Sequence, residues 1–196
     1  MNYENLYAQI TDHLVSDGYI IIENALNEEL PNALKNFATT QSSFKKAGIS
    51  NAKDVHIDSN KRKDSIQWLD EDQAVQSDYL DFSNGLKAYL NKELYLGLSY
   101  YESHFSIYDK GDFYEKHLDA FKHSKNRVVT TVYYLNEGWK KEDEGELLIY
   151  NKENTLLKKV SPKSNTLVVF LSDKFPHEVL PAKRKRYSIA GWFRVD

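Results

Sequence analysis

The sequence predicts a mainly β protein of the α+β class, in which N-terminal helices pack on a closed or double-sheet β fold such as a jelly roll. The first half of the chain carries apolar residues at helical spacing. The second half carries short β-branched and aromatic runs between Gly, Asn, Asp and Pro turns. The 14 Tyr and 9 Phe favour strands. We predict one domain over residues 1–196, with helical support mostly in 1–92 and the β core in about 94–195.

The first elements are predicted from apolar spacing and turn residues. Apolar side chains at Leu6, Ile10 and Leu14 predict a helix over residues 3–17, which Gly18 ends. The β-branched run over 18–26 predicts a buried strand.

Two more helices are expected before the strands begin. Asn27 is a candidate cap of a second helix, with Pro31 in its first turns and Leu30, Leu34 and Phe37 on its core face. A third helix is expected over 72–92, where apolar residues recur every three or four positions.

Residues 39–65 are polar and lack periodicity, which predicts a long loop of the kind that is usually functional or disordered. The loop contains a His-x-Asp motif, His56 and Asp58. We expect ordinary polar loop residues there, and a metal site is the alternative. Residues 66–69 then enter a short strand.

Strands are expected throughout the C-terminal half of the chain. The predicted strands cover residues 96–109, 113–119, 128–136, 145–151, 155–162, 166–172, 177–181 and 186–195.

The composition narrows the possible partners and the compartment. A net charge of −3 gives no general attraction to nucleic acid. The basic run 183–186 is expected to be a solvated turn with one buried member. The chain has 0 Cys, which excludes disulfides and thiolate ligands and favours a reducing cytoplasm. The first residues do not resemble a signal peptide, and no apolar stretch is long enough to span a membrane, so we predict a cytoplasmic protein.

The predicted strand 113–119 ends in a His-x-Asp pair, His117 and Asp119. Residues two apart on a strand face the same side, so both side chains would reach into one space. His177, at the start of a later strand, offers a third ligand. Two His and one carboxylate form the facial triad of non-haem Fe(II) oxygenases, although Mn, Co, Ni or Zn could occupy the same ligands. The alternative for each His alone is an ordinary core or surface histidine.

Arg186 lies on the strand that follows His177, and a guanidinium inside a barrel needs an anionic partner. It could pair bidentately with the distal carboxylate of a bound acid such as 2-oxoglutarate. Tyr134 could donate a second hydrogen bond to that carboxylate, with Thr130 and Ser188 assisting. The alternative for Tyr134 is a core aromatic residue.

From Tyr108 to Arg194 the sequence resembles the catalytic domain of the HIF prolyl hydroxylases and their bacterial prolyl 4-hydroxylase relatives. The matching stretches are YDKGDFYEKHLD, VVTTVYYLNEGW, GELLIY, LSDKFPHEVLPA and RYSIAGWF, with DGYIIIENAL and RKDSIQWLDE upstream. The resemblance implies a double-stranded β-helix that uses Fe(II), 2-oxoglutarate and O2, with ascorbate as a possible reductant. It also implies hydroxylation of a peptidyl proline in a protein target, with release of succinate and CO2.

Carried over by position, the resemblance implies that His117, Asp119 and His177 bind iron and form the catalytic centre. It implies that Arg186 holds the C5 carboxylate, with Tyr134 and Thr130, and Ser188 remains a candidate there.

Further positions match residues of the family around the active site. Tyr108 falls where the family has a tyrosine that bonds the co-substrate near the metal. Tyr114 and Trp192 fall on aromatic residues at the active-site mouth. Arg62 and Asp64 lie at the end of a loop that the family uses to enclose substrate. The segment 120–127 departs from the family pattern, and the cysteines of the animal members are absent, which leaves the substrate open.

Three alternatives to prolyl hydroxylation follow from the same residues. One is a 2-oxoglutarate oxygenase acting on a free amino acid or small molecule. Another is a nucleic-acid demethylase of the AlkB type, which the acidic pI of about 6.1 and the spacing of Arg186 and Arg194 disfavour. The third is a metal-binding barrel without catalysis. Among protein targets, the bacterial relatives suggest a translation factor such as elongation factor Tu. The oligomeric state stays open.

Overall fold

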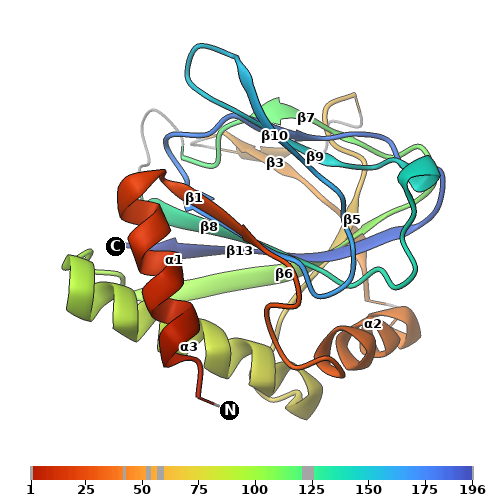
Figure 1. Cartoon of the computed structure of the whole chain (residues 1–196). Helices are drawn as coiled ribbons and strands as arrows, with labels where there is room; N and C mark the ends of the chain where they lie inside the picture. Colours follow the sequence, from red (N-terminus) through yellow and green to blue (C-terminus); the bar gives the residue numbers. More distant parts are fainter. Residues whose placement is uncertain (1, 42, 52–53, 57–59, 121–125, 196) are drawn as a thin grey trace.

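The computed structural model describes residues 2–41, 43–51, 54–56, 60–120 and 126–195 (Figure 1). Asp58 lies outside these residues, and the side chain of His56 is not described either, so the second His-x-Asp motif lies outside the described part. No described helix is both long enough and apolar enough to cross a membrane.

The predicted helices are present, with one shifted start. The helices are α1 (Glu4–Ser16), α2 (Leu30–Thr40), α3 (Ala74–Leu94) and the short 3-10 helix η1 (Lys141–Asp143). The predicted cap Asn27 does not cap α2. Its Oδ1 instead accepts a hydrogen bond from the Glu29 amide at 3.0 Å, so it forms a turn before the helix.

The described strands form two sheets that face each other and one separate hairpin (Figure 1). The major sheet has the order β1-β11-β8-β13-β6-β5-β2. Its strands are β1 (Tyr19–Ile22), β11 (Leu167–Leu171), β8 (Arg127–Tyr134), β13 (Arg186–Arg194), β6 (Tyr100–Tyr108), β5 (Ser65–Trp68) and β2 (Lys45–Lys46). The minor sheet has the order β10-β9-β12-β7, with β10 (Leu156–Val160), β9 (Leu147–Tyr150), β12 (His177–Val179) and β7 (Tyr114–His117).

The segment 39–65 is not the structureless loop that its polarity predicts. It contains β2 and the hairpin of β3 (Ile49–Asn51) and β4 (Asp54–His56). Its end pairs with the minor sheet, since the Lys63 amide donates to the Phe113 carbonyl at 3.1 Å and the Glu115 amide donates to the Lys61 carbonyl at 2.8 Å. The chain then enters β5 and pairs with β6. This strap, residues 61–68, therefore joins an edge of the minor sheet to the major sheet.

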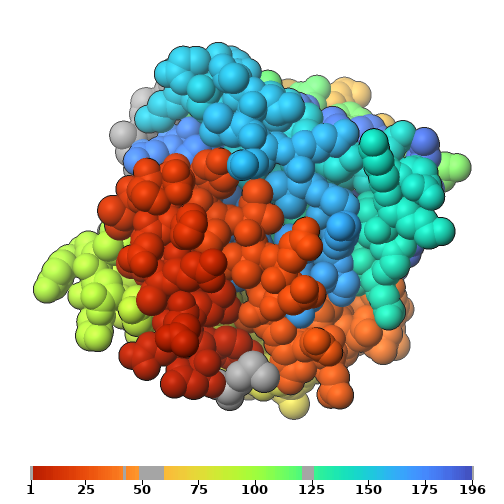
Figure 2. Space-filling model, viewed as in Figure 1, coloured from red at the N-terminus to blue at the C-terminus, as the bar shows by residue number. Residues whose placement is uncertain are grey.

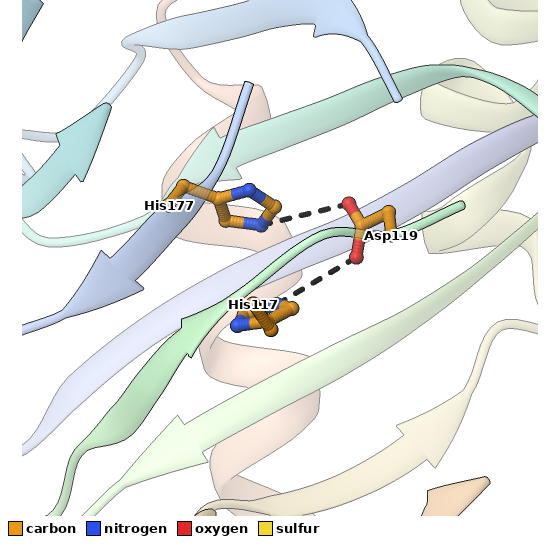
Figure 3. A group of neighbouring side chains, drawn as sticks. All are labelled: His117, Asp119 and His177. Atoms are coloured by element: carbon orange, nitrogen blue, oxygen red, sulfur yellow. Dashed lines mark ion pairs between the residues drawn. The ribbon is translucent and has the colours of Figure 1, made fainter. Parts of the chain in front are cut away.

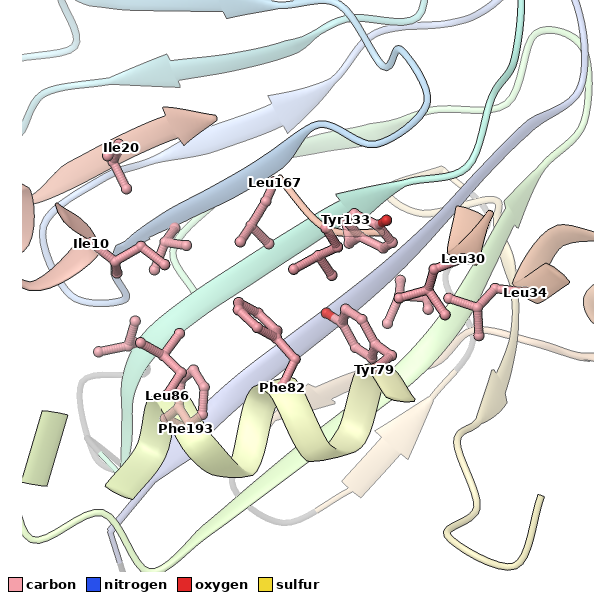
Figure 4. Close-up of a cluster of buried hydrophobic side chains, with 14 of the residues drawn as sticks. Ile10, Ile20, Leu30, Leu34, Tyr79, Phe82, Leu86, Tyr133, Leu167 and Phe193 are labelled. Atoms are coloured by element: carbon pink, nitrogen blue, oxygen red, sulfur yellow. The ribbon is translucent and has the colours of Figure 1, made fainter. Parts of the chain in front are cut away.

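The main hydrophobic core lies outside the two sheets, between the helices and the outer face of the major sheet. Figure 4 shows Tyr79, Phe82 and Leu86 of α3 pointing toward this face, where Tyr133, Leu167 and Phe193 meet them. Burying each such apolar side chain contributes about 1.5–3 kcal/mol. In the view of Figure 1, α1 and the residues after it cover the lower front of the molecule (Figure 2).

The inner face of the major sheet is more polar, because alternate residues of its strands point between the two sheets. On β13, Ile189 and Phe193 join the helix-side core, whereas Arg186, Ser188 and Trp192 face the interior. This alternation delivers the polar side chains of the candidate site to one enclosed space.

His104 is a buried imidazole on β6. Its side chain is 2% exposed and contacts the rings of Trp68 and Trp192, with centroids 5.2 and 5.3 Å away. Burial lowers the pKa of His104 to about 4, because the charged imidazolium would lose its hydration.

The lowered pKa of His104 predicts that the folded protein loses stability as the pH is lowered. Below its ordinary pKa of about 6.5 the unfolded chain binds a proton that the folded protein excludes, so acid favours unfolding. At pH 5 the loss attributable to this residue is about 2 kcal/mol. The test compares the unfolding free energy of metal-free protein at pH 7 and pH 5, measured by urea titration. In His104→Gln, the difference between the two values should be smaller than in wild type by about that amount. An equal pH dependence in variant and wild type would contradict the assignment.

Candidate active site

A pocket between the two sheets collects most of the residues that the sequence singled out. The predicted residues in its lining are Arg62, Tyr108, Tyr114, His117, Asp119, Thr130, His177, Arg186, Ser188 and Trp192. The remaining lining residues are Ser106, Arg127, Val132, Leu147, Val179 and Ala190. Tyr134 and Asp64, also predicted, are fully buried and do not belong to this lining.

His117, Asp119 and His177 converge at one point of the pocket (Figure 3). The Nε2 atom of His117 lies 3.6 Å from Oδ1 of Asp119, and that of His177 lies 3.5 Å from Oδ2. One potential ligand atom from each residue lies within 4.8 Å of the other two. Each oxygen of the carboxylate therefore faces one imidazole, and the two rings lie next to each other with centroids 4.3 Å apart.

The local geometry differs from the predicted one. Strand β7 ends at His117, and Asp119 lies in a bend beyond it, so the two do not share a strand face. The bend is held by the Ala120 amide, which donates to the Ser172 carbonyl at 3.4 Å. Asp119 reaches the imidazoles because the chain turns.

Both imidazoles are oriented by the backbone two residues upstream. Nδ1 of His117 lies 2.7 Å from the Glu115 carbonyl, and Nδ1 of His177 lies 3.0 Å from the Phe175 carbonyl. A carbonyl only accepts, so each Nδ1 carries the hydrogen and each Nε2 keeps a free lone pair. The tautomer suited to metal binding is thus built into the fold.

The protonation states also suit a metal. Burial lowers the pKa of His117, and the neighbouring His177 lowers it further, so His117 is neutral. Burial alone would raise the pKa of Asp119, but the two imidazoles outweigh it and keep the pKa below its ordinary value. Neutral imidazole and ionised carboxylate are the forms that bind metals.

Thr130 lines the pocket from the predicted strand, but its hydroxyl has a different partner. Its hydroxyl donates to Oδ2 of Asp119 at 2.8 Å and lies 2.8 Å from the Ser172 hydroxyl. On β8 it stands four residues from Tyr134, roughly 13 Å along the strand. The prediction that Thr130 helps hold a carboxylate at Arg186 is therefore corrected, because its hydroxyl serves Asp119.

Arg186 is buried, with 1% of its surface exposed. Its Nε donates to the Gly145 carbonyl at 3.1 Å, and one terminal nitrogen donates to the Ser188 hydroxyl at 3.3 Å. The guanidinium carbon lies 5.0 Å from the ring centroids of both Tyr108 and Tyr134. Within the described residues it has no carboxylate partner, and the buried Tyr134 hydroxyl has no hydrogen-bond partner either.

Neighbouring basic residues are neutralised within the protein. Lys183, Arg184 and Lys185 form ion pairs with Glu144, Asp143 and Asp109. Arg194 pairs with Glu102 at 2.7 Å. Since burying an unpaired charge is costly, the site at Arg186 is complete only with an anion.

Two β-bulges bring residues into the pocket that simple alternation would exclude. Between Tyr114 and His117, β7 carries an extra residue relative to β12, so both side chains face inward and their rings stack with centroids 3.6 Å apart. A second irregularity, near Val128, turns Arg127 into the pocket. Sequence reasoning missed Arg127 because strict alternation places it on the helix side.

Sequence reasoning also missed Ser172, although a signal for it was present. Alternation along β11 places Val168 and Phe170 in the inner apolar cluster. Continued for one more step, it points Ser172 to the same interior.

Arg62 and Asp64 form a bidentate ion pair in the strap, with nitrogen–oxygen distances of 2.6 and 2.9 Å. Arg62 also lies over the Tyr114 ring, 4.7 Å from its centroid. Asp64 is 0% exposed, so the prediction that it contacts substrate is corrected. Its role is to hold Arg62 at the pocket.

Trp192 lines the same end of the pocket as Thr130, its register partner on β8. The guanidinium carbon of Arg127 lies 3.8 Å from the centroid of the indole ring, and Arg127 pairs with Glu102 at 3.2 Å. The indole is therefore fixed by stacking, as expected for a rigid wall beside Asp119.

Comparison with known proteins identifies the family. A model of the 2OG-Fe(II) oxygenase superfamily matches residues 103–194. The crystal structure of a Pseudomonas putida prolyl-4-hydroxylase is 36% identical and has a TM-score of 0.88, with 97% of this chain and 100% of that chain covered. The chain belongs to the 2OG-Fe(II) oxygenase superfamily.

Two further relatives of this oxygenase carry the name prolyl hydroxylase. A Trichoplax adhaerens prolyl hydroxylase, solved with a peptide of the hypoxia-inducible factor oxygen degradation domain, is 28% identical. Its TM-score is 0.82, with 97% of this chain and 90% of that chain covered. The hypoxia-inducible factor prolyl hydroxylase of Caenorhabditis elegans is 38% identical over 42% of this chain and 12% of its own length. Egl nine homolog 1 of Rattus norvegicus is 36% identical over 42% of this chain and 25% of its own. The aligned part is thus a small share of these two relatives.

The predicted fold is confirmed as a double-stranded β-helix, and the residues present fit the superfamily's Fe(II) and 2-oxoglutarate. Two imidazoles and a carboxylate suit Fe(II). At the other end, the buried guanidinium of Arg186 and the unpartnered Tyr134 hydroxyl suit a carboxylate. A dicarboxylic acid that spans these two ends would satisfy both.

We expect His117→Ala and Asp119→Ala to abolish 2-oxoglutarate turnover while the protein stays folded. Each change removes one of three candidate ligands from the wall of a pocket, and neither residue belongs to the helix-side core that stabilises the fold. Succinate formation measures turnover, and circular dichroism measures folding. Glu115→Ala is the control, since this side chain is exposed on the same strand. Retention of more than a few per cent of wild-type turnover by either variant would contradict the assignment.

Proposed function

We propose that this oxygenase hydroxylates a prolyl residue in a protein target, using Fe(II), 2-oxoglutarate and O2 and releasing succinate and CO2. The observation that carries the oxygenase chemistry is the two-ended pocket, with three candidate metal ligands at one end and an uncompensated guanidinium at the other. The choice of proline rests on the similarity to the Pseudomonas putida prolyl-4-hydroxylase along nearly the whole chain.

We assign His117, Asp119 and His177 as the ligands of Fe(II) and as the catalytic centre. When bound, the iron would couple oxidation of 2-oxoglutarate by O2 to hydroxylation of the substrate. The protein supplies orientation, since the backbone carbonyls fix both imidazoles and leave their Nε2 atoms toward the pocket.

We assign Arg186, Tyr134 and Ser188 to the distal carboxylate of 2-oxoglutarate. Arg186 supplies the charge, Tyr134 supplies a buried hydroxyl, and Ser188 accepts a hydrogen bond that orients the guanidinium. Tyr108, whose ring lies beside Arg186 and which lines the pocket, is proposed to contact the co-substrate nearer the metal.

Substrate is proposed to enter past the strap and the neighbouring aromatic rings. Arg62, Tyr114 and Trp192 are the proposed contacts, and all of them line the pocket. The ring of Tyr114 is stacked on His117, so a residue held by Tyr114 would lie next to the metal centre.

The target is proposed to be a protein, and a translation factor such as elongation factor Tu is one candidate. Mass spectrometry of cell extract treated with the enzyme would reveal it as an added oxygen on proline. A 2-oxoglutarate oxygenase acting on a free amino acid is the second candidate, and turnover with and without a proline peptide separates the two. A cytoplasmic location and the use of ascorbate stay predictions.

Arg186→Ala is expected to raise the KM for 2-oxoglutarate by about 30- to 1000-fold, because losing a buried charge-assisted contact costs about 2–4 kcal/mol. Tyr134→Phe should cost less, about 1 kcal/mol. Arg186→Lys, which keeps the charge but loses the planar fork, should fall between wild type and Arg186→Ala. Steady-state kinetics with varied 2-oxoglutarate measures all three. An unchanged KM in Arg186→Ala would move the carboxylate site elsewhere.

The hairpin of β3 and β4 is expected to serve a macromolecular substrate. Replacing residues 49–58 by a short Gly-Ser linker keeps the strap and its pairing to both sheets. The variant should bind 2-oxoglutarate and metal normally yet hydroxylate a protein target at least about tenfold more slowly. The reason is that segments beside an active site often control the access of substrate. Binding is measured by titration and hydroxylation by mass spectrometry. Normal hydroxylation of the protein target would show that the hairpin is a passive insertion.

A further inference from the structure

A chain of buried hydroxyls runs from Ser172, just after the end of β11, through Thr130 on β8 to the carboxylate of Asp119. The Thr130 hydroxyl lies 2.8 Å from Oδ2 of Asp119 and 2.8 Å from the Ser172 hydroxyl. Thr130 is 1% exposed and Ser172 is 0% exposed, so neither hydroxyl exchanges freely with bulk water.

The direction of the hydrogen bonds follows from the charge of Asp119. An ionised carboxylate only accepts, so the Thr130 hydroxyl donates its hydrogen to Oδ2. Thr130 then has only acceptor capacity left, and Ser172 must donate to it. Each hydroxyl has one defined role, which leaves the carboxylate a single preferred orientation.

The need for such an anchor follows from the position of Asp119. It lies in a bend beyond the end of β7, so its backbone is outside the ladder that positions His117. Ser172 ties this bend to the sheet, since its carbonyl accepts from the Ala120 amide at 3.4 Å and its amide donates to the Val128 carbonyl at 3.0 Å. Ser172 thus contacts the bend through its backbone and the carboxylate through Thr130.

We propose that Thr130 and Ser172 are positioning residues, which hold the Asp119 carboxylate in the orientation that binds the metal. This inference rests on the proposed metal site. It gives Thr130 a role different from the co-substrate contact that the sequence implies. Hydrogen-bond partners of metal ligands typically contribute about 10- to 100-fold to metal affinity.

The test is titration of the metal-free protein with Co(II), followed by its visible absorption bands, which report both affinity and coordination. We expect Thr130→Val to bind Co(II) about 10- to 100-fold more weakly than wild type. Thr130→Ser, which keeps the hydroxyl, should restore most of the affinity. Ser172→Ala should weaken binding by up to about tenfold, because Thr130 loses its donor.

Thr131→Val is the matched control on the same strand. Thr131 is also buried, but its hydroxyl faces the helix side and lies 2.8 Å from the Tyr101 hydroxyl. This variant should keep wild-type Co(II) affinity and an unchanged spectrum, even if it is less stable.

The possible outcomes separate the inference from the function on which it rests. Wild type that fails to bind Co(II) would contradict the metal site and this inference together. If wild type binds Co(II) and the affinity of Thr130→Val is within about twofold of it, the inference alone is overturned. An equal loss of Co(II) affinity in Thr130→Val and in the control Thr131→Val would overturn it too. If Thr130→Val does not fold, the deciding measurement is the Co(II) affinity of Ser172→Ala. An affinity equal to that of wild type would overturn the inference.

Discussion

The packing of the helices on the outer face of the major sheet is the interaction on which the rest of this structure depends. Residues such as Leu34, Phe82 and Leu86 bury their apolar surface there, away from the space between the sheets. Most of the favourable burial is thus obtained on one side of the sheet. The inner face can then carry a guanidinium and hydroxyls, groups that would destabilise a core.

The two ends of the pocket satisfy their charges in opposite ways. The negative charge of Asp119 is met inside the protein, by a hydroxyl and two imidazoles. Among the residues that the structure describes, the positive charge of Arg186 is met only by a carbonyl, a serine hydroxyl and two aromatic faces. The metal-ligand end is therefore ordered by the fold itself, whereas on our proposal the other end gains its balancing charge from a ligand. Selectivity for a dicarboxylic acid would follow from this asymmetry.

Much of the fold and of the site is encoded locally. Helical spacing places α1 and α3 within a few residues, and the alternation along β13 places Arg186 and Ser188 on one face. Other features depend on pairing between distant segments, which a sequence pattern does not report. The bend at Asp119, the inward turn of Arg127 and the pairing of the strap with β7 are of this kind. Asp64 was misjudged for the same reason, since its burial results from the strap crossing between the sheets.

The bulge in β7 decides which rings of this strand face the pocket. Tyr114 and His117 are an odd number of positions apart, yet both face the pocket because one residue between them has no counterpart on β12. If this strand paired regularly at its present length, one of the two rings would turn out to solvent. A deletion at Glu115 or Lys116 that removed the bulge would instead leave the two residues two positions apart and still on one face. An engineer who grafts a regular strand of the same length here would therefore lose the stacked pair, and an alignment to a relative that lacks the bulge needs a gap in this stretch.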